Sequence, residues 1–257
     1  MKTVRVRGHF GEYLQGRLGP VGPLGLITVP CPKTGLQAEL QSGDHRVAHS
    51  LAGFLQALGL AAKGEIGLSL LSPPGAGTGI STARLIAAAR LHGWQGPAGR
   101  LMAACVAEEG ASDPLAFVHP ERLLWASREG RILQPMPVLP AHDIVGGYFG
   151  APCSTDPADV DFPDVSDIVA DWQGTRDLQG FAELASESAR RCLRMRGPAD
   201  DPTEELARNL GAAGLLIAHT GSARGLIFPK GEVPPDAASA LEAAGLAGVM
   251  QFGSDDG

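Results

Sequence analysis

A glycine-rich loop that runs directly into an alanine-rich helical pattern is the feature that most constrains this chain. Residues 71–94 read LSPPGAGTGISTARLIAAARLHGW. Glycine adopts positive φ values and lets a backbone come close to a ligand. The start of the following helix has unpaired N–H groups at the positive end of its dipole. Together they predict an anion site, most often for phosphate. The alternative is an ordinary helix N-terminus with turn glycines.

The loop differs from three widespread phosphate-binding loops. A Walker A loop ends in Gly-Lys followed by Ser or Thr, whereas Ile80 stands here in the place of the lysine. The dinucleotide fingerprint G-x-G-x-x-G has a different spacing from Gly75, Gly77 and Gly79. A protein kinase would need HRD and DFG segments, and the sequence contains neither. Without a loop lysine, a bound metal ion would have to neutralise much of the phosphate charge.

Composition places the chain among globular proteins of one large or two small domains. Of its 257 residues 44% are hydrophobic, and the charged fraction of 19% is too low for a disordered chain. The net charge of −7, with four lysines and no basic run, argues against nucleic acid as a partner. No apolar run is long enough for a membrane span or a signal-peptide core. Four widely spaced cysteines without a CxxC pair predict a reduced, cytoplasmic protein without a zinc site.

Periodicity predicts a mixture of helices and short antiparallel strands. Polar–apolar alternation predicts strands at residues 3–9 and 35–41, and a short apolar run predicts another at residues 24–30. Residues 11–16 are predicted to form a turn or loop. A hairpin is predicted with its turn at Glu129-Gly130. The order is not a regular βαβ alternation, so the predicted fold class is α+β. The predicted helices cover residues 47–60, 79–91, 100–109, 166–172, 178–195, 202–210 and 234–244.

Residues 73–83, PPGAGTGISTA, resemble the phosphate loop of the GHMP kinases, which include galactokinase, homoserine kinase and mevalonate kinase. The family form is P-x-x-x-G-[LM]-[GA]-S-S-[AT]. Thr78 replaces its leucine or methionine and Ile80 its first serine, while Ser81 matches the second serine. The resemblance implies that ATP binds through a run of nine residues, namely Pro74, Gly75, Ala76, Gly77, Thr78, Gly79, Ile80, Ser81 and Thr82.

Three further segments resemble one branch of this family, the L-threonine kinases of cobalamin synthesis. Residues 8–16, GHFGEYLQG, are similar to the first family motif in the form G-x-x-G-E-x-x-Q-G. Residues 218–228, AHTGSARGLIF, resemble the third motif. Residues 108–117, EEGASDPLAF, resemble an E-P-[ST]-D segment in a stretched form. The resemblance thus extends over nearly the whole chain, although only the central loop is specific by itself.

The resemblance implies a two-domain GHMP kinase architecture. Residues 1–140 would form an ATP-binding domain of the ribosomal S5 domain 2-like type, and residues 141–257 a ferredoxin-like domain. ATP and the acceptor would meet in the cleft between them. The expected partner is a small molecule with a hydroxyl group, an amino acid by the resemblance. Neither nucleic acid nor a membrane is expected, and a homodimer is left open.

The resemblance also assigns the catalytic and metal-binding side chains. Asp113 would be the general base for the substrate hydroxyl, with the N-cap of a helix at Pro114 as the alternative. Ser81 and Glu109 would bind Mg²⁺ through oxygen, with Glu108 as a substitute for Glu109. A solvated helix end is the alternative role for both glutamates.

The substrate pocket is expected to contain Glu12, whose carboxylate would accept hydrogen bonds from an ammonium group. An exposed turn acid is the alternative. Arg224 would pair with a substrate carboxylate or phosphate, or else be a surface arginine. His9 and His219 lack metal-ligand spacing and are expected to be structural. The other pocket candidates are Tyr13, Gln15, Gly221 and Ser222.

The activity that the resemblance implies is Mg²⁺- and ATP-dependent phosphorylation of L-threonine to O-phospho-L-threonine, for cobalamin biosynthesis. Two alternatives stay open. One is a kinase for another small alcohol such as homoserine. The other is a non-catalytic protein that binds a nucleotide or metabolite, which the altered loop residues Thr78 and Ile80 keep open.

Overall fold

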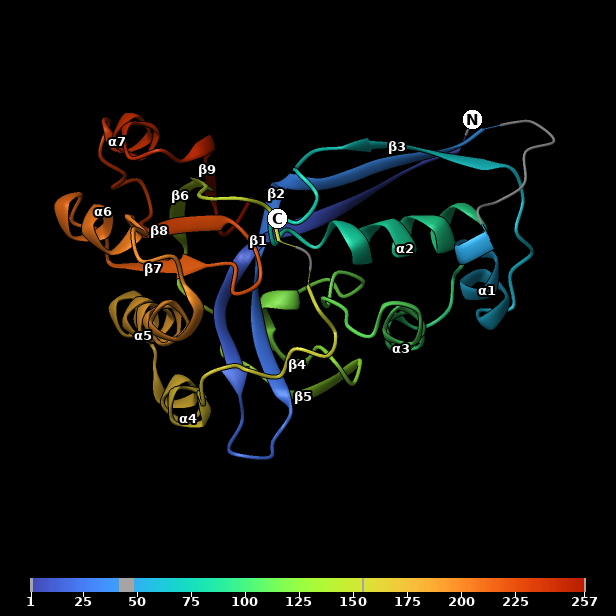
Figure 1. Cartoon of the computed structure of the whole chain (residues 1–257), viewed down its shortest axis with the longest axis horizontal. Coiled ribbons are helices and arrows are strands. Elements are labelled where there is room, and N and C mark those ends of the chain that lie inside the picture. The colour runs from blue at the N-terminus through green and yellow to red at the C-terminus, as the bar shows by residue number, and fades with distance from the viewer. Residues whose placement is uncertain (1, 42–48, 154, 257) are drawn as a thin grey trace.

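Nine strands form one continuous sheet (Figure 1) in this computed structural model, which describes residues 2–41, 49–153 and 155–256. The strand order is β5-β4-β2-β1-β7-β8-β6-β9, with β3 paired to the C-terminal part of β2, and the paired strands run antiparallel. The predicted α+β class is confirmed. The strands are β1 (Thr3–Arg17), β2 (Leu24–Gln41), β3 (Glu65–Leu70), β4 (Leu123–Ala126), β5 (Arg131–Pro135), β6 (His142–Tyr148), β7 (Gly214–Ile217), β8 (Ala223–Pro229) and β9 (Ala247–Gly253).

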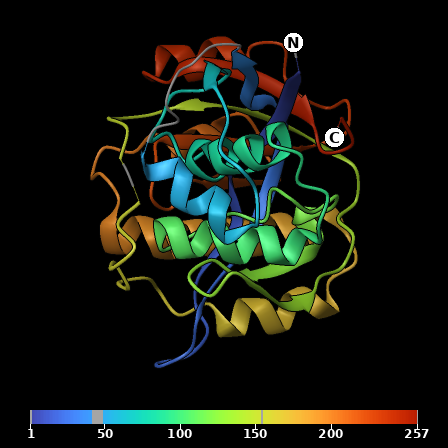
Figure 2. The ribbon, with the colours of Figure 1, turned by 90° about the vertical axis from the view of Figure 1, so that its right-hand side faces the viewer.

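The helices pack in two groups. Helices α1, α2 and α3 contact one another, and α2 also packs on β1 and β2 (Figures 1 and 2). Helix α5 packs on β1 and β7, while α6 contacts β7 and β8 and α7 contacts β6 and β9. None of the helices in the described ranges is long and apolar enough to cross a membrane. The helices are α1 (His49–Ala57), α2 (Ile80–Leu91), α3 (Ala98–Glu109), α4 (Ser166–Gly174), α5 (Leu178–Arg196), α6 (Thr203–Asn209) and α7 (Ala237–Ala243), and Pro120–Arg122 form one 3-10 turn.

The long hairpin of β1 and β2 joins the two ends of the sheet (Figure 1). On its other side β1 pairs with β7, where Glu12 lies opposite Ile217. The register between β1 and β2 shifts three times between residues 7 and 14, and Gly11 in this stretch has a φ of 70°. Residues 11–16 were predicted to form a turn or loop, but they belong to a bulged strand. Glycine allows the backbone conformation that such a bulge requires.

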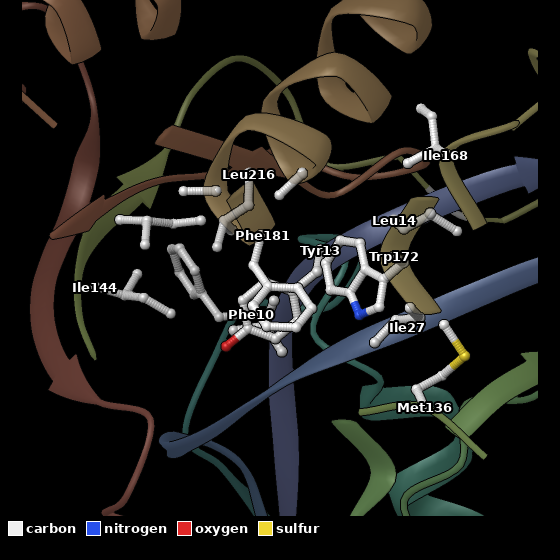
Figure 3. Packing of buried hydrophobic residues seen from close by; sticks show 14 of the residues in the cluster. Phe10, Tyr13, Leu14, Ile27, Met136, Ile144, Ile168, Trp172, Phe181 and Leu216 are labelled. Carbon is white, nitrogen blue, oxygen red and sulfur yellow. The ribbon is translucent and has the colours of Figure 1, made fainter. Parts of the chain in front are cut away.

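Hydrophobic packing follows the chain in three clusters. The buried residues of one cluster all come from residues 6–125, and those of another from residues 145–246. The third cluster lies between them and combines Phe10 of β1 with Trp172 of α4 and other residues of both parts (Figure 3). Because the sheet and this central cluster both cross residue 140, the division into two domains stays a prediction.

The predicted helices near the loop lie close to their predicted bounds. The helix predicted over residues 79–91 is α2, and the one predicted over 100–109 is α3. The helix predicted over 47–60 corresponds to α1, while residues 47 and 48 lie outside the described residues. The predicted hairpin turn at Glu129-Gly130 connects β4 and β5.

Candidate active site

In the glycine loop before α2, every second residue has a left-handed backbone conformation. Gly75, Gly77 and Gly79 have φ values of 75°, 74° and 71°, which residues with a side chain rarely adopt. Packing also excludes side chains here, because a Cβ on Gly77 would overlap that of Ala218. A Cβ on Gly79 would lie 2.7 Å from Cδ2 of His9. The glycines therefore let the loop lie directly on β1 and on the segment after β7.

The carbonyl groups of the loop are bonded to the surrounding chain. The carbonyl oxygens of residues 75–78 accept hydrogen bonds of 2.8–3.3 Å from the N–H groups of Cys153, Ala223, Gly11 and His9, in that order. In a trans peptide the N–H points opposite to the carbonyl. The N–H groups of Thr78 and Gly79 therefore point away from β1. Helix α2 begins at Ile80 without a side-chain cap, which leaves its first N–H groups without a side-chain partner.

A cavity of about 440 Å³ lies beside this loop. Of the nine predicted nucleotide-binding residues, all but Ala76 line the cavity, and Ala76 is buried behind the loop. Leu68 and Leu70 of β3 line it as well, although each is about two-fifths exposed. An uncapped helix start that borders a cavity favours the predicted anion site over an ordinary helix N-terminus.

The loop residue Thr78 has a structural contact that accounts for its departure from the family form. Its hydroxyl lies 2.9 Å from that of Ser72 and only 2% of the residue is exposed. The oxygen of Ser72 in turn accepts a hydrogen bond from the N–H of Gly35. The Thr78 hydroxyl thus connects the loop to Ser72 and, through Ser72, to β2. The backbone of Thr78, rather than its hydroxyl, remains available to a ligand.

The predicted metal ligands Ser81 and Glu109 lie together in the cavity wall. The Ser81 hydroxyl donates a 2.6 Å hydrogen bond to Oε1 of Glu109, which also lies 3.4 Å from a guanidinium nitrogen of Arg84. Burial raises the pKa of Glu109, although its contacts with Ser81 and Arg84 oppose this. Glu108, the alternative ligand, is exposed and does not line the cavity. A hydroxyl and a partly buried carboxylate are oxygen ligands that suit Mg²⁺.

Asp113 lines the same cavity. Its N–H donates a 3.2 Å hydrogen bond to the hydroxyl of Thr82, in the first turn of α2. No helix begins at Pro114, where the described chain forms only turns, so Asp113 is not a helix N-cap. The side chain is about one quarter exposed, and Oδ2 lies 3.3 Å from Nε2 of His9.

His9, which was expected to be structural, is a buried residue that lines the cavity. Its Nδ1 lies 3.6 Å from Oε1 of Glu12 and 3.2 Å from the carbonyl oxygen of Gly11. Its Nε2 faces Asp113 as an ion pair and has no hydrogen-bond partner of good geometry among the described residues. Burial lowers the pKa of His9, but the carboxylates of Asp113 and Glu12 outweigh it and raise the pKa to about 9.

The arrangement of His9, Glu12 and Asp113 suits an ion-pair chain better than a metal site. Their potential ligand atoms all lie within 4.8 Å of one another. However, the two carboxylates face different nitrogens of the imidazole ring, so the ring lies between them. The bulge in β1 explains how residues 9 and 12, which would point to opposite faces of a regular strand, come together.

Glu12 and Gln15 line the cavity as predicted, and His219 holds Glu12 from behind. The backbone N–H of His219 and its Nδ1 lie 3.3 and 3.4 Å from Oε2 of Glu12. Nε2 of His219 contacts the hydroxyl of Ser188, which accepts a hydrogen bond from the N–H of Gln15. Glu12 is only 6% exposed, which excludes the alternative of an exposed turn acid.

Two predicted substrate residues point elsewhere. Tyr13 lies in the central core, and its hydroxyl is 2.8 Å from Nε2 of His142. Arg224 donates from Nε to Asp201 at 2.6 Å and from Nη1 to the carbonyl oxygens of Gly221 and Ala223. Neither side chain lines the cavity. The strand alternation of β1 sends Tyr13 to the opposite face from Glu12, and a buried carboxylate already neutralises Arg224.

The segment after β7 supports the loop from behind instead of facing a substrate. Gly221 and Ser222 do not line the cavity, whereas Thr220 does. A Cβ on Gly221 would overlap the backbone nitrogen of Gly77. The N–H of Ala223 donates to the carbonyl oxygen of Ala76 at 3.0 Å. The two glycine-containing segments are therefore packed backbone to backbone.

Solved structures of small-molecule kinases share this fold over nearly their whole length. Mevalonate kinase from L. major, in complex with R-mevalonate, matches with a TM-score of 0.61 and 12% identity, covering 98% of this chain and 95% of that one. Homoserine kinase from Cytophaga hutchinsonii matches with a TM-score of 0.60 and 15% identity, covering 98% and 94%. A 4-(cytidine 5'-diphospho)-2C-methyl-D-erythritol kinase matches with a TM-score of 0.60 and 16% identity, covering 98% of both chains.

No protein-family model matches the sequence, and no curated protein sequence matches it significantly. At identities of 12–16% the structural likeness shows the fold, and it confirms the GHMP kinase fold that the sequence resemblance implied.

Proposed function

We propose that this chain is an ATP-dependent small-molecule kinase of the GHMP type, and that it phosphorylates the hydroxyl of L-threonine to O-phospho-L-threonine. One observation carries the kinase class: the left-handed glycines and uncapped helix start meet the Ser81–Glu109 pair and Asp113 in one cavity. The shared fold of the mevalonate and homoserine kinases supports the same class. A role in cobalamin synthesis goes with threonine and rests on the sequence resemblance.

The nucleotide would lie along the loop and β3. Backbone N–H groups from Thr78 to Thr82 would bind the phosphate oxygens at the positive end of the α2 dipole. The exposed faces of Leu68 and Leu70 in the cavity wall would cover the flat base. Because apolar side chains exposed in a cavity gain from being covered, they favour a ligand with an apolar or aromatic part at this end.

Ser81 and Glu109 would hold Mg²⁺ beside the phosphates. The ion would supply the positive charge that a loop without lysine lacks, and it would stabilise charge on the transferring phosphoryl group. Glu109 gains from such a partner, because its carboxylate is partly buried beside a hydroxyl and a half-exposed arginine. Arg84 would remain at the cavity mouth as a second positive charge.

Asp113 would accept the proton in the transfer step. The oxygen of the substrate hydroxyl attacks the γ-phosphorus, the bond to the bridging oxygen breaks, and ADP leaves with that oxygen. The hydroxyl proton passes to the Asp113 carboxylate. His9 fixes the position of that carboxylate through its ion pair, and Thr82 fixes the backbone of the same residue. Contacts with both β1 and α2 thereby fix the position of Asp113.

The amino-acid part of the proposal depends on Glu12. The Glu12 carboxylate lines the cavity next to His9, and its oxygens would accept hydrogen bonds from a substrate ammonium group. Glu12, Asp113 and a protonated His9 together carry one net negative charge. A cationic group on the substrate is therefore attracted to the end of the cavity where Asp113 can reach a hydroxyl.

An ADP-release assay with Mg-ATP tests the proposal. The acceptor panel is L-threonine, L-homoserine, L-serine, R-mevalonate and glycerol, with wild type and Asp113→Asn. We expect the highest turnover with threonine, and a loss of roughly 10²- to 10⁴-fold in kcat for the variant. Homoserine is the second candidate acceptor, because a homoserine kinase is among the structural neighbours.

The outcomes separate the competing functions. Faster turnover of homoserine than threonine would replace the substrate and keep the kinase. A thermal shift with Mg-ATP without turnover of any alcohol would favour the non-catalytic nucleotide-binding protein. The absence of any thermal shift would contradict the nucleotide site itself. An unimpaired Asp113→Asn variant would show that Asp113 is not the base.

A further inference from the structure

Arg128 lies at the acceptor end of the cavity, in the turn at residues 127–130 between β4 and β5. Its neighbour Ser127 accepts a 2.9 Å hydrogen bond from the N–H of Ser112, the residue before Asp113. All four of these residues line the cavity. The hairpin therefore places a guanidinium group beside the segment that carries the proposed base.

The guanidinium of Arg128 has an N–H group that can still donate a hydrogen bond to a ligand. Its Nη2 donates to the backbone carbonyl oxygens of Asp156 at 3.0 Å and Asp159 at 3.4 Å. Its Nε is buried and has no partner among the described residues. Burial lowers the pKa of Arg128, and the nearby carboxylates of Asp159, Asp113 and Asp156 raise it without restoring the usual value. A partly buried guanidinium with an unpaired, buried N–H group gains from an anion that accepts a hydrogen bond from it.

The other arginine that lines the cavity already has an ion-pair partner. Arg84 is about half exposed and pairs with Glu109 at the phosphate end. Lysine does not occur among the described residues that line the cavity. Arg128 is therefore the arginine that a negative group on the acceptor would meet next to Asp113.

We propose that Arg128 binds a carboxylate of the acceptor, which makes the acceptor a hydroxy acid and, together with Glu12, a zwitterionic hydroxy amino acid. This inference rests on the proposed kinase function. Glu12 lies on β1, and Arg128 follows β4, with β2 between the two strands. Ala126 pairs with Gly25 of β2, which pairs with Gly16 of β1, so Arg128 is also displaced along β1 from Glu12, toward the C-terminal end of that strand. Both residues line the same cavity, so an acceptor that lies between them would present its amino group to Glu12 and its carboxylate to Arg128.

The test pairs the arginine with the carboxylate it is proposed to bind. Wild type and Arg128→Gln are assayed with L-threonine and with 1-amino-2-propanol, which has the hydroxyl and amine but no carboxylate. We expect the variant to lose roughly 10- to 150-fold in kcat/KM for threonine, the effect of one hydrogen bond to a charged group. Its kcat/KM for aminopropanol should stay within about threefold of wild type, since that substrate has no carboxylate to lose.

A second measurement does not depend on turnover of the poorer substrate. L-2-Aminobutyrate keeps the carboxylate and lacks the hydroxyl, so it should inhibit competitively against threonine. Its inhibition constant should rise by the same factor in Arg128→Gln, while the KM for ATP stays unchanged. A general folding defect would lower kcat without this selective change.

Arg196→Gln is the matched control. Arg196 also donates to the segment at residues 159–161, through the Asp159 carboxylate and the carbonyl oxygen of Asp161, but it does not line the cavity. We expect it to leave the ratio of the two acceptors unchanged. Equal losses of kcat/KM on both acceptors in Arg128→Gln would overturn the inference and leave the proposed kinase function intact. The same selectivity change in Arg196→Gln would do so as well. Wild type that turns over neither acceptor would refute the threonine proposal, and this inference with it.

Discussion

Replacing His9 by glutamine should remove a specific pH dependence from the stability of the protein. The imidazole is fully buried between two carboxylates, and its pKa rises from 6.5 to about 9. One pH unit of pKa difference corresponds to about 1.4 kcal/mol. The proton on His9 therefore contributes about 3 kcal/mol to the free energy of unfolding.

The direction of the effect follows from linkage. The folded state binds the His9 proton more tightly than the unfolded state does, so the contribution is fully present below pH 6.5. It is lost as the pH rises through about 9. Between pH 6 and pH 10 wild type should lose about 3 kcal/mol more than His9→Gln, whose amide does not titrate.

Urea unfolding at several pH values measures this difference. His119→Gln is the control, because the His119 side chain is more than half exposed and pairs with the neighbouring Glu121. Wild type and His119→Gln should show the same steep loss of stability above neutral pH. Parallel pH profiles for wild type and His9→Gln would refute the protonated bridge between Glu12 and Asp113.

Three further predictions concern the loop, the metal ligand and the segment behind the loop. Gly77→Ala should lower the free energy of unfolding, measured with urea, by roughly 2–5 kcal/mol, because the new Cβ would sit at a left-handed φ and overlap Ala218. A loss under about 1 kcal/mol would contradict this packing. Glu109→Gln should raise the Mg²⁺ concentration for half-maximal activity at least about tenfold with little change in unfolding, and an unchanged Mg²⁺ dependence would exclude it as a ligand. Arg224→Gln should lower the free energy of unfolding by about 3–5 kcal/mol, because it leaves the buried Asp201 carboxylate without its ion-pair partner. The double variant with Asp201→Asn should recover part of that loss. A loss below about 1 kcal/mol for Arg224→Gln would contradict a structural ion pair.

The loop and its helix could be predicted from sequence because their signals are local. Glycine spacing and the alanine-rich periodicity both lie within residues 71–94. The structure adds the reason for the spacing, since Gly77 and Gly79 are pressed against Ala218 and His9. Sequence could not show these neighbours, which are distant along the chain.

The side chains around the substrate end were harder to predict, because a bulge decides where they point. In a regular strand alternate residues share a face, and the register shifts of β1 change this rule between residues 7 and 14. His9 was therefore missed. Tyr13 was assigned to the pocket through its motif, although the alternation of β1 places it on the opposite face from Glu12, in the core. Arg128 carried no sequence signal beyond its place in a predicted hairpin.

Arg224 shows a different limit. The motif around it predicted a functional segment, and the structure shows that this segment contacts the loop. Its partner Asp201 lies 23 residues earlier, in no motif, and its carboxylate decides the direction of the guanidinium. A single sequence cannot reveal a buried ion pair of this kind.

Amide hydrogen exchange on the glycine loop tests the central claim most directly. The account predicts that saturating Mg²⁺ and a non-hydrolysable ATP analogue slow exchange strongly in peptides that cover residues 75–82. Peptides from α7, which packs on β6 and β9, should be unaffected. Unchanged exchange in the loop at a nucleotide concentration that saturates binding would show that its backbone amides do not bind the phosphates.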